Sequence, residues 1–180
     1  MFPVGSLVVY GNAGVCRVRS VSHPDMDGID ENALYYELEP VYHGGTIFTP
    51  VDQNRIVIRE PITREEAQAL LDGIGSLQLI DCKGADRHQL STAYADALDS
   101  HDCEQMLRLL LTISHRREAA LAHKRKPGQM DERVLRQVED LLYGELAVAL
   151  EIDKSKVPAL VASAILTAEI KRKKRTETAE

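Results

Sequence analysis

The sequence of 180 residues contains no tryptophan, only two phenylalanines and only three cysteines. The cysteines, Cys16, Cys82 and Cys103, are widely spaced and form no CxxC pair, which argues against a disulfide framework and against a zinc site. No apolar run approaches the ~20 residues that span a bilayer, and the first residues lack a basic region followed by an apolar one. We therefore expect a cytoplasmic protein that does not enter a membrane.

Motifs of catalysis are also missing from the sequence, which has no P-loop, GxGxxG, HExxH or GxSxG pattern. His101 and Cys103 lie two residues apart, but no second pair of ligands completes a tetrahedral metal site. Two pairs of adjacent acids, Glu65-Glu66 and Asp131-Glu132, lie at expected helix starts, where the helix dipole favours them. Helix capping explains these acids better than acid–base catalysis does, so we expect no enzyme, no metal and no cofactor.

The net charge of −6 is unevenly distributed along the chain. Residues 1–75 carry 5 Lys/Arg and 11 Asp/Glu, whereas residues 76–180 carry 17 of each. An acidic first part repels nucleic acid, and a neutral second part with basic clusters can accept it locally. The two parts are therefore expected to have different partners.

Five short apolar segments, separated by turns rich in glycine, predict β-strands. They are Leu7–Tyr10, Val15–Val21, Leu34–Glu39, Thr46–Thr49 and Arg55–Arg59. In the second segment Cys16 and Val18 share a face, and Val21 falls out of phase, which indicates a bulge or a strand end. In the fifth, Ile56 and Ile58 are expected to face inward. An acidic loop is expected over His23–Asn32. Closure of these strands into a small barrel would remove the sheet edges.

The period then changes from two to that of a helix. Thr63 and Glu66 form a capping box that predicts a helix ending near Gly73, and the later apolar stripes predict four more. These four are expected over Gln89–Ser100, Asp102–His123, Asp131–Leu150 and from Asp153 or Ser155 onward. Asp131 is expected to cap the third of these, whose wide apolar surface makes it the centre of a bundle. The last is expected to turn Val157, Leu160, Val161, Ala164 and Ile165 inward.

The fold class that follows is α+β, with an N-terminal five-stranded Tudor-like or SH3-like β-barrel and a C-terminal all-helical bundle. We expect the barrel over residues 1–61 and a connecting helix and linker over 62–84. The helical domain is expected over 85–170, and a basic flexible tail over 171–180.

Phe48 is a candidate binding residue in the fourth predicted strand. If Ile47 and Thr49 face the interior, alternation places Thr46 and Phe48 outside. A shift of one residue would reverse this and bury Phe48, and the sequence supports both readings equally.

A group of basic residues in the helical part is a candidate surface for nucleic acid. Its members are Arg116, Arg117, Lys124, Arg125, Lys126, Arg133 and Arg136. Cations at a helix end also satisfy the helix dipole, so a purely solvated group is the alternative.

Several segments, taken in order and spacing, carry a resemblance to a known family. In the first part of the chain these segments are residues 2–10 (Phe-Pro-Val-Gly-Ser-Leu-Val-Val-Tyr), 14–15, 35–38 (Tyr-Tyr-Glu-Leu), 46–51 (Thr-Ile-Phe-Thr-Pro-Val) and 62–63. In the second part they are residues 131–135 (Asp-Glu-Arg-Val-Leu) and 142–147 (Leu-Tyr-Gly-Glu-Leu-Ala). Through them the sequence resembles the CarD family of transcription regulators, whose head is shared with the transcription-repair coupling factor.

The resemblance implies a non-enzymatic bacterial regulator. Its barrel would bind the RNA polymerase β subunit, and its helical domain would contact promoter DNA weakly at the upstream edge of the bubble. The polymerase contacts implied are Thr46, Phe48, Ser22 and His23. Many members insert a tryptophan as a wedge in the minor groove. Here the corresponding region offers Ile80, Arg87 and His88. The DNA contacts expected are Arg87, His88 and the seven basic residues above.

Two functional hypotheses follow. The first is a monomeric transcription regulator that binds both polymerase and promoter DNA and changes the stability of the open complex. The second is an adaptor that binds polymerase or another protein without DNA contact, which the missing tryptophan and the overall acidity favour. An enzyme acting on a small molecule is a third, weaker alternative, because no convergent polar set is visible.

Overall fold

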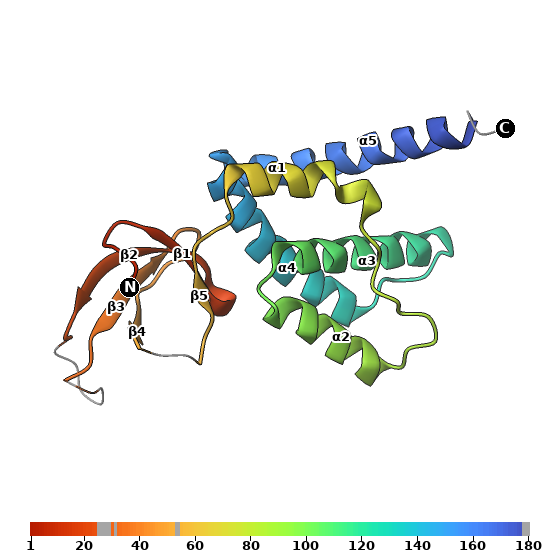
Figure 1. Ribbon diagram of the computed structural model, residues 1–180. Coiled ribbons are helices and arrows are strands. Elements are labelled where there is room, and N and C mark those ends of the chain that lie inside the picture. Colours follow the sequence, from red (N-terminus) through yellow and green to blue (C-terminus); the bar gives the residue numbers. More distant parts are fainter. Residues whose placement is uncertain (25–29, 31, 53–54, 178–180) are drawn as a thin grey trace. The chain divides into compact units, whose positions relative to one another are not determined.

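The computed structural model describes residues 1–24, 30, 32–52 and 55–177, and the side chains up to residue 173. The chain divides into two compact units, Met1–Pro61 and Ile62–Glu180. The first unit holds the strands and the second the long helices (Figure 1). Most of the acidic loop expected over His23–Asn32 lies outside the described residues. Among those described, no helix is both long and apolar enough to cross a membrane.

The first unit is one antiparallel sheet. Its strands are β1 Leu7–Tyr10, β2 Gly14–Ser22, β3 Tyr35–Pro40, β4 Ile47–Pro50 and β5 Ile58–Arg59, with the 3-10 turn η1 Gly11–Ala13 between β1 and β2. The strand order is β4-β3-β2-β1-β5, which leaves β4 and β5 at the edges. The Tudor-like architecture is confirmed, but closure into a barrel is wrong. The two edge strands have only four and two residues, too short to complete a closed ladder.

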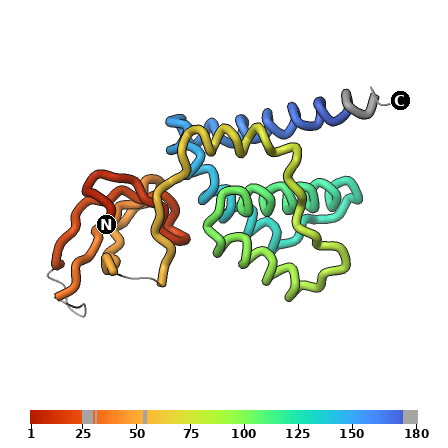
Figure 2. The backbone as a smooth tube through the Cα atoms, in the orientation of Figure 1, coloured from red at the N-terminus to blue at the C-terminus, as the bar shows by residue number. Residues whose placement is uncertain are grey.

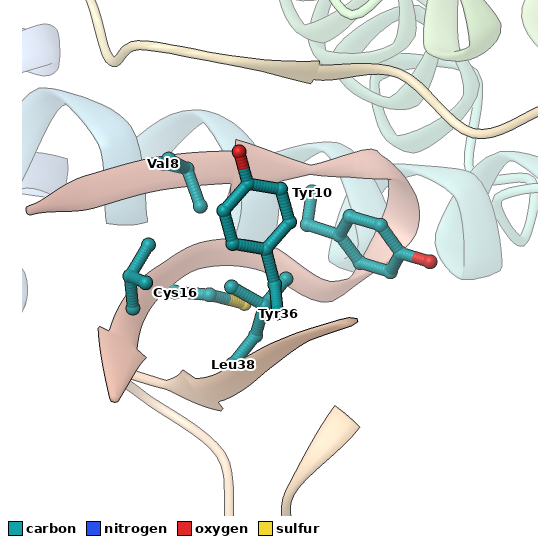
Figure 3. Packing of buried hydrophobic residues seen from close by; sticks show 6 residues of the cluster. Val8, Tyr10, Cys16, Tyr36 and Leu38 are labelled. Atoms are coloured by element: carbon teal, nitrogen blue, oxygen red, sulfur yellow. The ribbon is translucent and has the colours of Figure 1, made fainter. Parts of the chain in front are cut away.

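The core of the first unit lies on one face of the three central strands. Val8 and Tyr10 from β1, Cys16 from β2, and Tyr36 and Leu38 from β3 turn toward one another (Figure 3). The partly buried side chain of Phe2 packs against this cluster, and its backbone N–H donates to the Tyr36 hydroxyl at 2.8 Å. The alternation predicted for β2 and β3 therefore produces the core as expected.

Irregularities of the sheet fall at two places. The register of β2 against β3 shifts between Val18 and Ser20, which is the bulge that the phase change at Val21 indicated. The strand predicted over Arg55–Arg59 is shorter than expected, and Ile56 is 39% exposed, so its inward assignment is wrong. Ile56 instead covers Gly11, where an added Cβ would lie 2.7 Å from Ile56 Cγ2.

The second unit consists of helices around α4. Its elements are α1 Arg64–Asp72, η2 Ile74–Ser76, α2 Arg87–Asp99, α3 Cys103–Ala122, α4 Gln129–Leu150, η3 Lys154–Lys156 and α5 Val157–Glu177. The stripe predicted for the central helix is buried: Leu135, Val138, Leu142, Leu146 and Leu150. Helix α4 packs against α1, α2, α3 and α5, so it forms the core of the unit as the sequence indicated.

The entry into this unit is fixed by polar contacts. Thr63 and Glu66 form the predicted capping box at the start of α1. Glu145 of α4, only 1% exposed, accepts a hydrogen bond of 2.9 Å from the backbone N–H of Ile62. Helix α1 then buries Ala67 and Leu71 against the bundle. The first helix therefore packs as part of the helical unit.

Segment 77–86 runs between η2 and α2 (Figure 2). Two hydrogen bonds connect this segment to α3. The Ile80 N–H donates to Thr112 Oγ1 at 2.9 Å, and Arg108 Nε donates to the Gln78 carbonyl at 2.8 Å. The expected linker thus follows the surface of α3, and Ile80 is held there.

Four helix predictions need correction. Helix α2 begins at Arg87 because Asp86 forms a capping box with Gln89, a signal that the sequence reading missed. Helix α4 begins after Gly128, so Asp131 lies inside its first turn and is not its cap. In α5, Leu160 is exposed whereas Val157 and Val161 are buried. The same helix continues to Glu177, so most of the segment expected as a flexible tail is helical.

Candidate functional site

The first candidate surface is the β4 edge, which we define as β4 with the residue before it. β4 pairs with β3 on one side, and in the described sheet no strand pairs with its other side. The backbone N–H and C=O groups on that side are therefore available to a strand of another chain. Thr46 precedes the strand and is exposed.

The orientation of Phe48 is settled by burial. Thr49 is 3% exposed and Phe48 is 37% exposed, so the outward reading of Phe48 is the right one. The register places Phe48 beside Glu37 of β3, which in turn lies beside Ser20 of β2. Ser20 Oγ donates to Glu37 Oε2 at 2.7 Å. Phe48 thus ends a row that runs across three strands on the outer face.

Ser22 and His23 lie at the far end of β2, at the level of Tyr35 and Pro50. Because alternate residues of a strand share a face, Ser22 is on the same face as Phe48 but two strands away from it. His23 Nδ1 is 3.0 Å from the carbonyl oxygen of Ala33. The four residues expected to bind polymerase are therefore divided between the edge and the end of the sheet.

The second candidate surface is a concave region beside the α3–α4 loop, which we call the α3–α4 hollow. It has a volume of about 710 Å³. Its lining includes the predicted DNA contacts Arg87, Arg116, Arg125 and Lys126, and His123 lies among them. Arg87 also lines a neighbouring hollow with Arg133 and Arg136. The fold thus gathers basic residues from α2, α3, α4 and the α3–α4 loop that are distant from one another in the sequence.

The turn after α3 positions the loop cations. Lys124 adopts a left-handed conformation with φ of 55°. Its N–H donates to the Leu121 carbonyl at 2.9 Å, and the Arg125 N–H donates to the Ala120 carbonyl at 2.8 Å. These two bonds form a Schellman motif, which reverses the chain after the helix. Lys126 follows this reversal and lines the hollow together with Arg125.

Arg116 belongs to a partly buried hydrogen-bond network with Asp131 and Tyr94. Its Nε donates to Asp131 Oδ2 at 3.1 Å, and the Tyr94 hydroxyl donates to Asp131 Oδ1 at 3.1 Å. Burial raises the pKa of Tyr94, and the charge of Asp131 raises it further. Burial alone would lower the pKa of Arg116. The electrostatic effects of Tyr94 and Asp131 are larger together and raise this pKa. This arginine therefore stays charged and neutralises Asp131.

The remaining predicted DNA contacts lie at separate places. Arg117 Nε pairs with Glu132 Oε1 at 3.2 Å on the surface between α3 and α4. His88 is exposed in the first turn of α2, and Lys124 is exposed in the turn after α3. Within the described part of the chain, no group of three His, Cys, Asp or Glu residues could hold a metal ion.

The functional neighbours that sequence reasoning missed are Glu37 beside Phe48, and Tyr94 and Asp131 beside Arg116. The pairing of Glu37 depends on the strand register, which the bulge in β2 alters. Asp131 showed one signal, an acid near a helix start, but its partners are 37 and 15 positions away. No local pattern would have indicated them.

Comparison with known proteins gives one family match. Residues 2–62 match the model of the CarD-like/TRCF RID domain; this is about one third of the chain and includes all five strands of the first unit. The chain matches no curated protein. The match supports an RNA polymerase-interacting transcription factor. The strand-rich first unit is therefore a CarD-like/TRCF RID domain, and the match does not extend to the helices of the second unit.

Proposed function

We propose that this protein is a bacterial transcription regulator that acts in the cytoplasm as a monomer, without catalysis or cofactor. Its first unit binds the β subunit of RNA polymerase through the β4 edge. Its helical unit contacts promoter DNA near the upstream edge of the bubble and changes the stability of the open complex. The observation that carries this proposal is the unpaired side of β4, with Phe48 exposed beside it, in a matched RID domain.

The β4 edge supports binding to a protein strand in two ways. Backbone groups on the open side provide hydrogen bonds that do not depend on the partner's sequence. Phe48 provides an apolar contact, and aromatic side chains are enriched among the residues that dominate binding energy. Glu37 beside it adds a negative charge that favours a basic residue on the partner.

The test of polymerase binding compares two substitutions at opposite edges of the sheet. Phe48→Ala in the full chain is expected to weaken capture of RNA polymerase by about tenfold or more, since loss of a central aromatic contact costs ~2 kcal/mol. Val57→Ala is the matched control, because Val57 is similarly exposed at 42% but precedes β5. Equal losses in both variants would refute the β4 edge as the polymerase contact.

The DNA part of the proposal is supported by the cations around the α3–α4 hollow. The full chain is expected to bind a forked promoter fragment weakly, with affinity that falls steeply as salt rises. Replacing Arg125 and Lys126 with alanine should lower the slope of log K against log salt by roughly 0.9 for each phosphate that is no longer neutralised. A slope equal to that of the unaltered protein would exclude these residues as DNA contacts.

Regulation is tested by the lifetime of the open complex with and without the protein. A longer lifetime would identify an activator and a shorter one a repressor. No change at saturating protein would refute the proposal that it acts on the open complex.

A second candidate function is an adaptor that binds polymerase without DNA. It is favoured by the pairing of Arg116 with Asp131 and of Arg117 with Glu132, which removes two cations from the potential DNA surface. Absence of any gel shift of the forked fragment at low salt, together with intact polymerase capture, would select this candidate.

A further inference from the structure

The α3–α4 hollow has the size of a small-molecule site. Its volume of about 710 Å³ lies within the range of roughly 300–1,000 Å³ found for ligand pockets. A DNA duplex does not require such a hollow, because its phosphates can be contacted by cations on an open surface. The concave shape therefore suggests a second ligand, smaller than a duplex.

The charge of the hollow selects an anion. Arg87 contributes from the start of α2, and Arg125 and Lys126 from the loop. The acid that lines it is Asp131, which is 7% exposed and neutralised by Arg116. The lining therefore has a formal charge of +3 with His123 neutral. A ligand with several negative charges close together would match it.

The start of α4 adds to this preference. Gly128 and Gln129 line the hollow, and Gly128, the residue before the helix, offers no side chain to the first-turn N–H groups. The positive end of the dipole of a helix of 22 residues thus lies beside the three cations.

The other part of the lining is apolar. Ala119 and Ala120 come from the last turns of α3, and Met130 from the first turn of α4. Methionine adapts to flat aromatic groups and contacts them favourably through its sulfur. A ligand with a charged end and a flat apolar end would satisfy both parts of the hollow.

We propose that the α3–α4 hollow binds a nucleoside polyphosphate. The phosphates contact Arg87, Arg125 and Lys126, and the base lies against the alanines of α3 and Met130. This site is additional to the DNA contact proposed above. A bound nucleotide would occupy the loop cations and so compete with DNA for them.

The experiment is a calorimetric titration of the full chain with ATP. Divalent cations are left out of the buffer, because they would bind the phosphates and neutralise their charge. We expect saturable binding of one ATP per chain. The double variant Arg125→Ala with Lys126→Ala should weaken it by about a hundredfold, taking about tenfold for each charge-assisted contact. Tripolyphosphate and adenosine, which carry only one part of the ligand each, should both bind more weakly than ATP.

Two further variants make the result specific to the hollow. Lys83→Ala with Lys156→Ala removes the same charge from exposed positions elsewhere in the unit and should leave ATP affinity nearly unchanged. Ala119→Glu places a carboxylate in the apolar wall and should abolish ATP binding while the helix persists, because glutamate is a good helix former. Circular dichroism checks the helical content of each variant.

The proposal is overturned if ATP shows no saturable binding, or if both double variants lose affinity equally. It is also overturned if tripolyphosphate binds as tightly as ATP, since the base would then have no contact. Forked DNA and polymerase binding are measured on the same preparations. If they persist while ATP does not bind, the nucleotide site fails and the proposed function stands.

Discussion

The two units present candidate surfaces of different shape and charge. The strand unit carries 4 Lys/Arg and 8 Asp/Glu, and its candidate surface is a sheet edge with one exposed aromatic side chain. The helical unit carries 18 Lys/Arg and 20 Asp/Glu, yet its candidate surface is a hollow with a formal charge of +3. The basic character of the hollow therefore comes from the local arrangement of its side chains and not from the net charge of the helical unit.

The ion pairs of the two units differ in how far they are exposed to solvent. Arg19 and Glu39 pair on the outer face of the sheet, with side chains 54% and 44% exposed. Arg116 and Asp131 pair at the hollow with side chains 35% and 9% exposed, and Tyr94 supplies a second donor to the acid. Exposed pairs contribute little to stability, whereas breaking a buried pair leaves an uncompensated charge.

Asp131→Ala is expected to lower the free energy of unfolding by about 3 kcal/mol, because it leaves Arg116 and the Tyr94 hydroxyl without their acceptor. Urea denaturation followed by circular dichroism measures the change. Tyr94→Phe is the control, since it removes only one neutral donor and should cost about 1 kcal/mol. If Asp131→Ala were no more destabilising than Tyr94→Phe, the buried pair would not hold the helices together.

The strand unit is expected to lose stability at alkaline pH through Cys16. Burial raises the pKa of this thiol from 9.0 to about 11. The unfolded chain therefore ionises first, so the contribution is present below pH 9 and is lost as the pH rises toward 11. The full loss, reached above pH 11, should be about 2–3 kcal/mol, since each pKa unit corresponds to about 1.4 kcal/mol, and between pH 8.5 and 10.5 it should be about 1.5–2 kcal/mol.

Urea denaturation at pH 8.5 and 10.5 would measure this loss, and Cys16→Ala is the control because it has no thiol to ionise. The variant is less stable at both pH values but should show a smaller difference between them. Identical pH dependence in the two proteins would mean that the thiol does not contribute.

Features that depend on neighbours in the sequence were predictable. Alternation in β2 and β3 indicated the core, and the stripe of α4 indicated the centre of the bundle. The Thr63–Glu66 capping box was also read correctly, because all of its hydrogen bonds lie within four residues. Period and capping are local properties, and the fold class follows from them.

Features that depend on register or on distant partners were not predictable. Ile56 was placed inside by alternation, but the strand shortens to two residues and Ile56 covers Gly11 instead. Asp131 resembled a helix cap in the sequence, but its carboxylate is taken up by Tyr94 and Arg116. The candidate residues could therefore be named from the sequence, whereas their grouping into an edge row and a hollow required the structure.

Asp86→Ala should lower the stability of the helical unit by about 1 kcal/mol, because the Asp86 side chain accepts from the Gln89 N–H at the start of α2. Arg87 follows directly, so loosening this turn should also weaken binding of the forked fragment. Thr63→Ala removes the equivalent cap of α1, which does not line the hollow. It should cost similar stability with no change in DNA affinity; equal loss of affinity in both variants would show that the effect is not local to Arg87.

The smallest effect is expected at the exposed pair of the sheet. A double-mutant cycle with Arg19→Gln and Glu39→Gln should give a coupling free energy of only about 0.5 kcal/mol, because water and salt screen both groups. Urea denaturation at low and high salt measures it, and the coupling should decrease at high salt. The coupling free energy of Arg19 and Glu39 could instead be as large as the loss of unfolding free energy caused by Asp131→Ala. That result would mean that solvent exposure does not determine how much an ion pair stabilises this protein. A small, salt-sensitive value would show that the fold of the strand unit does not depend on this pair, because both groups are well solvated when they are apart.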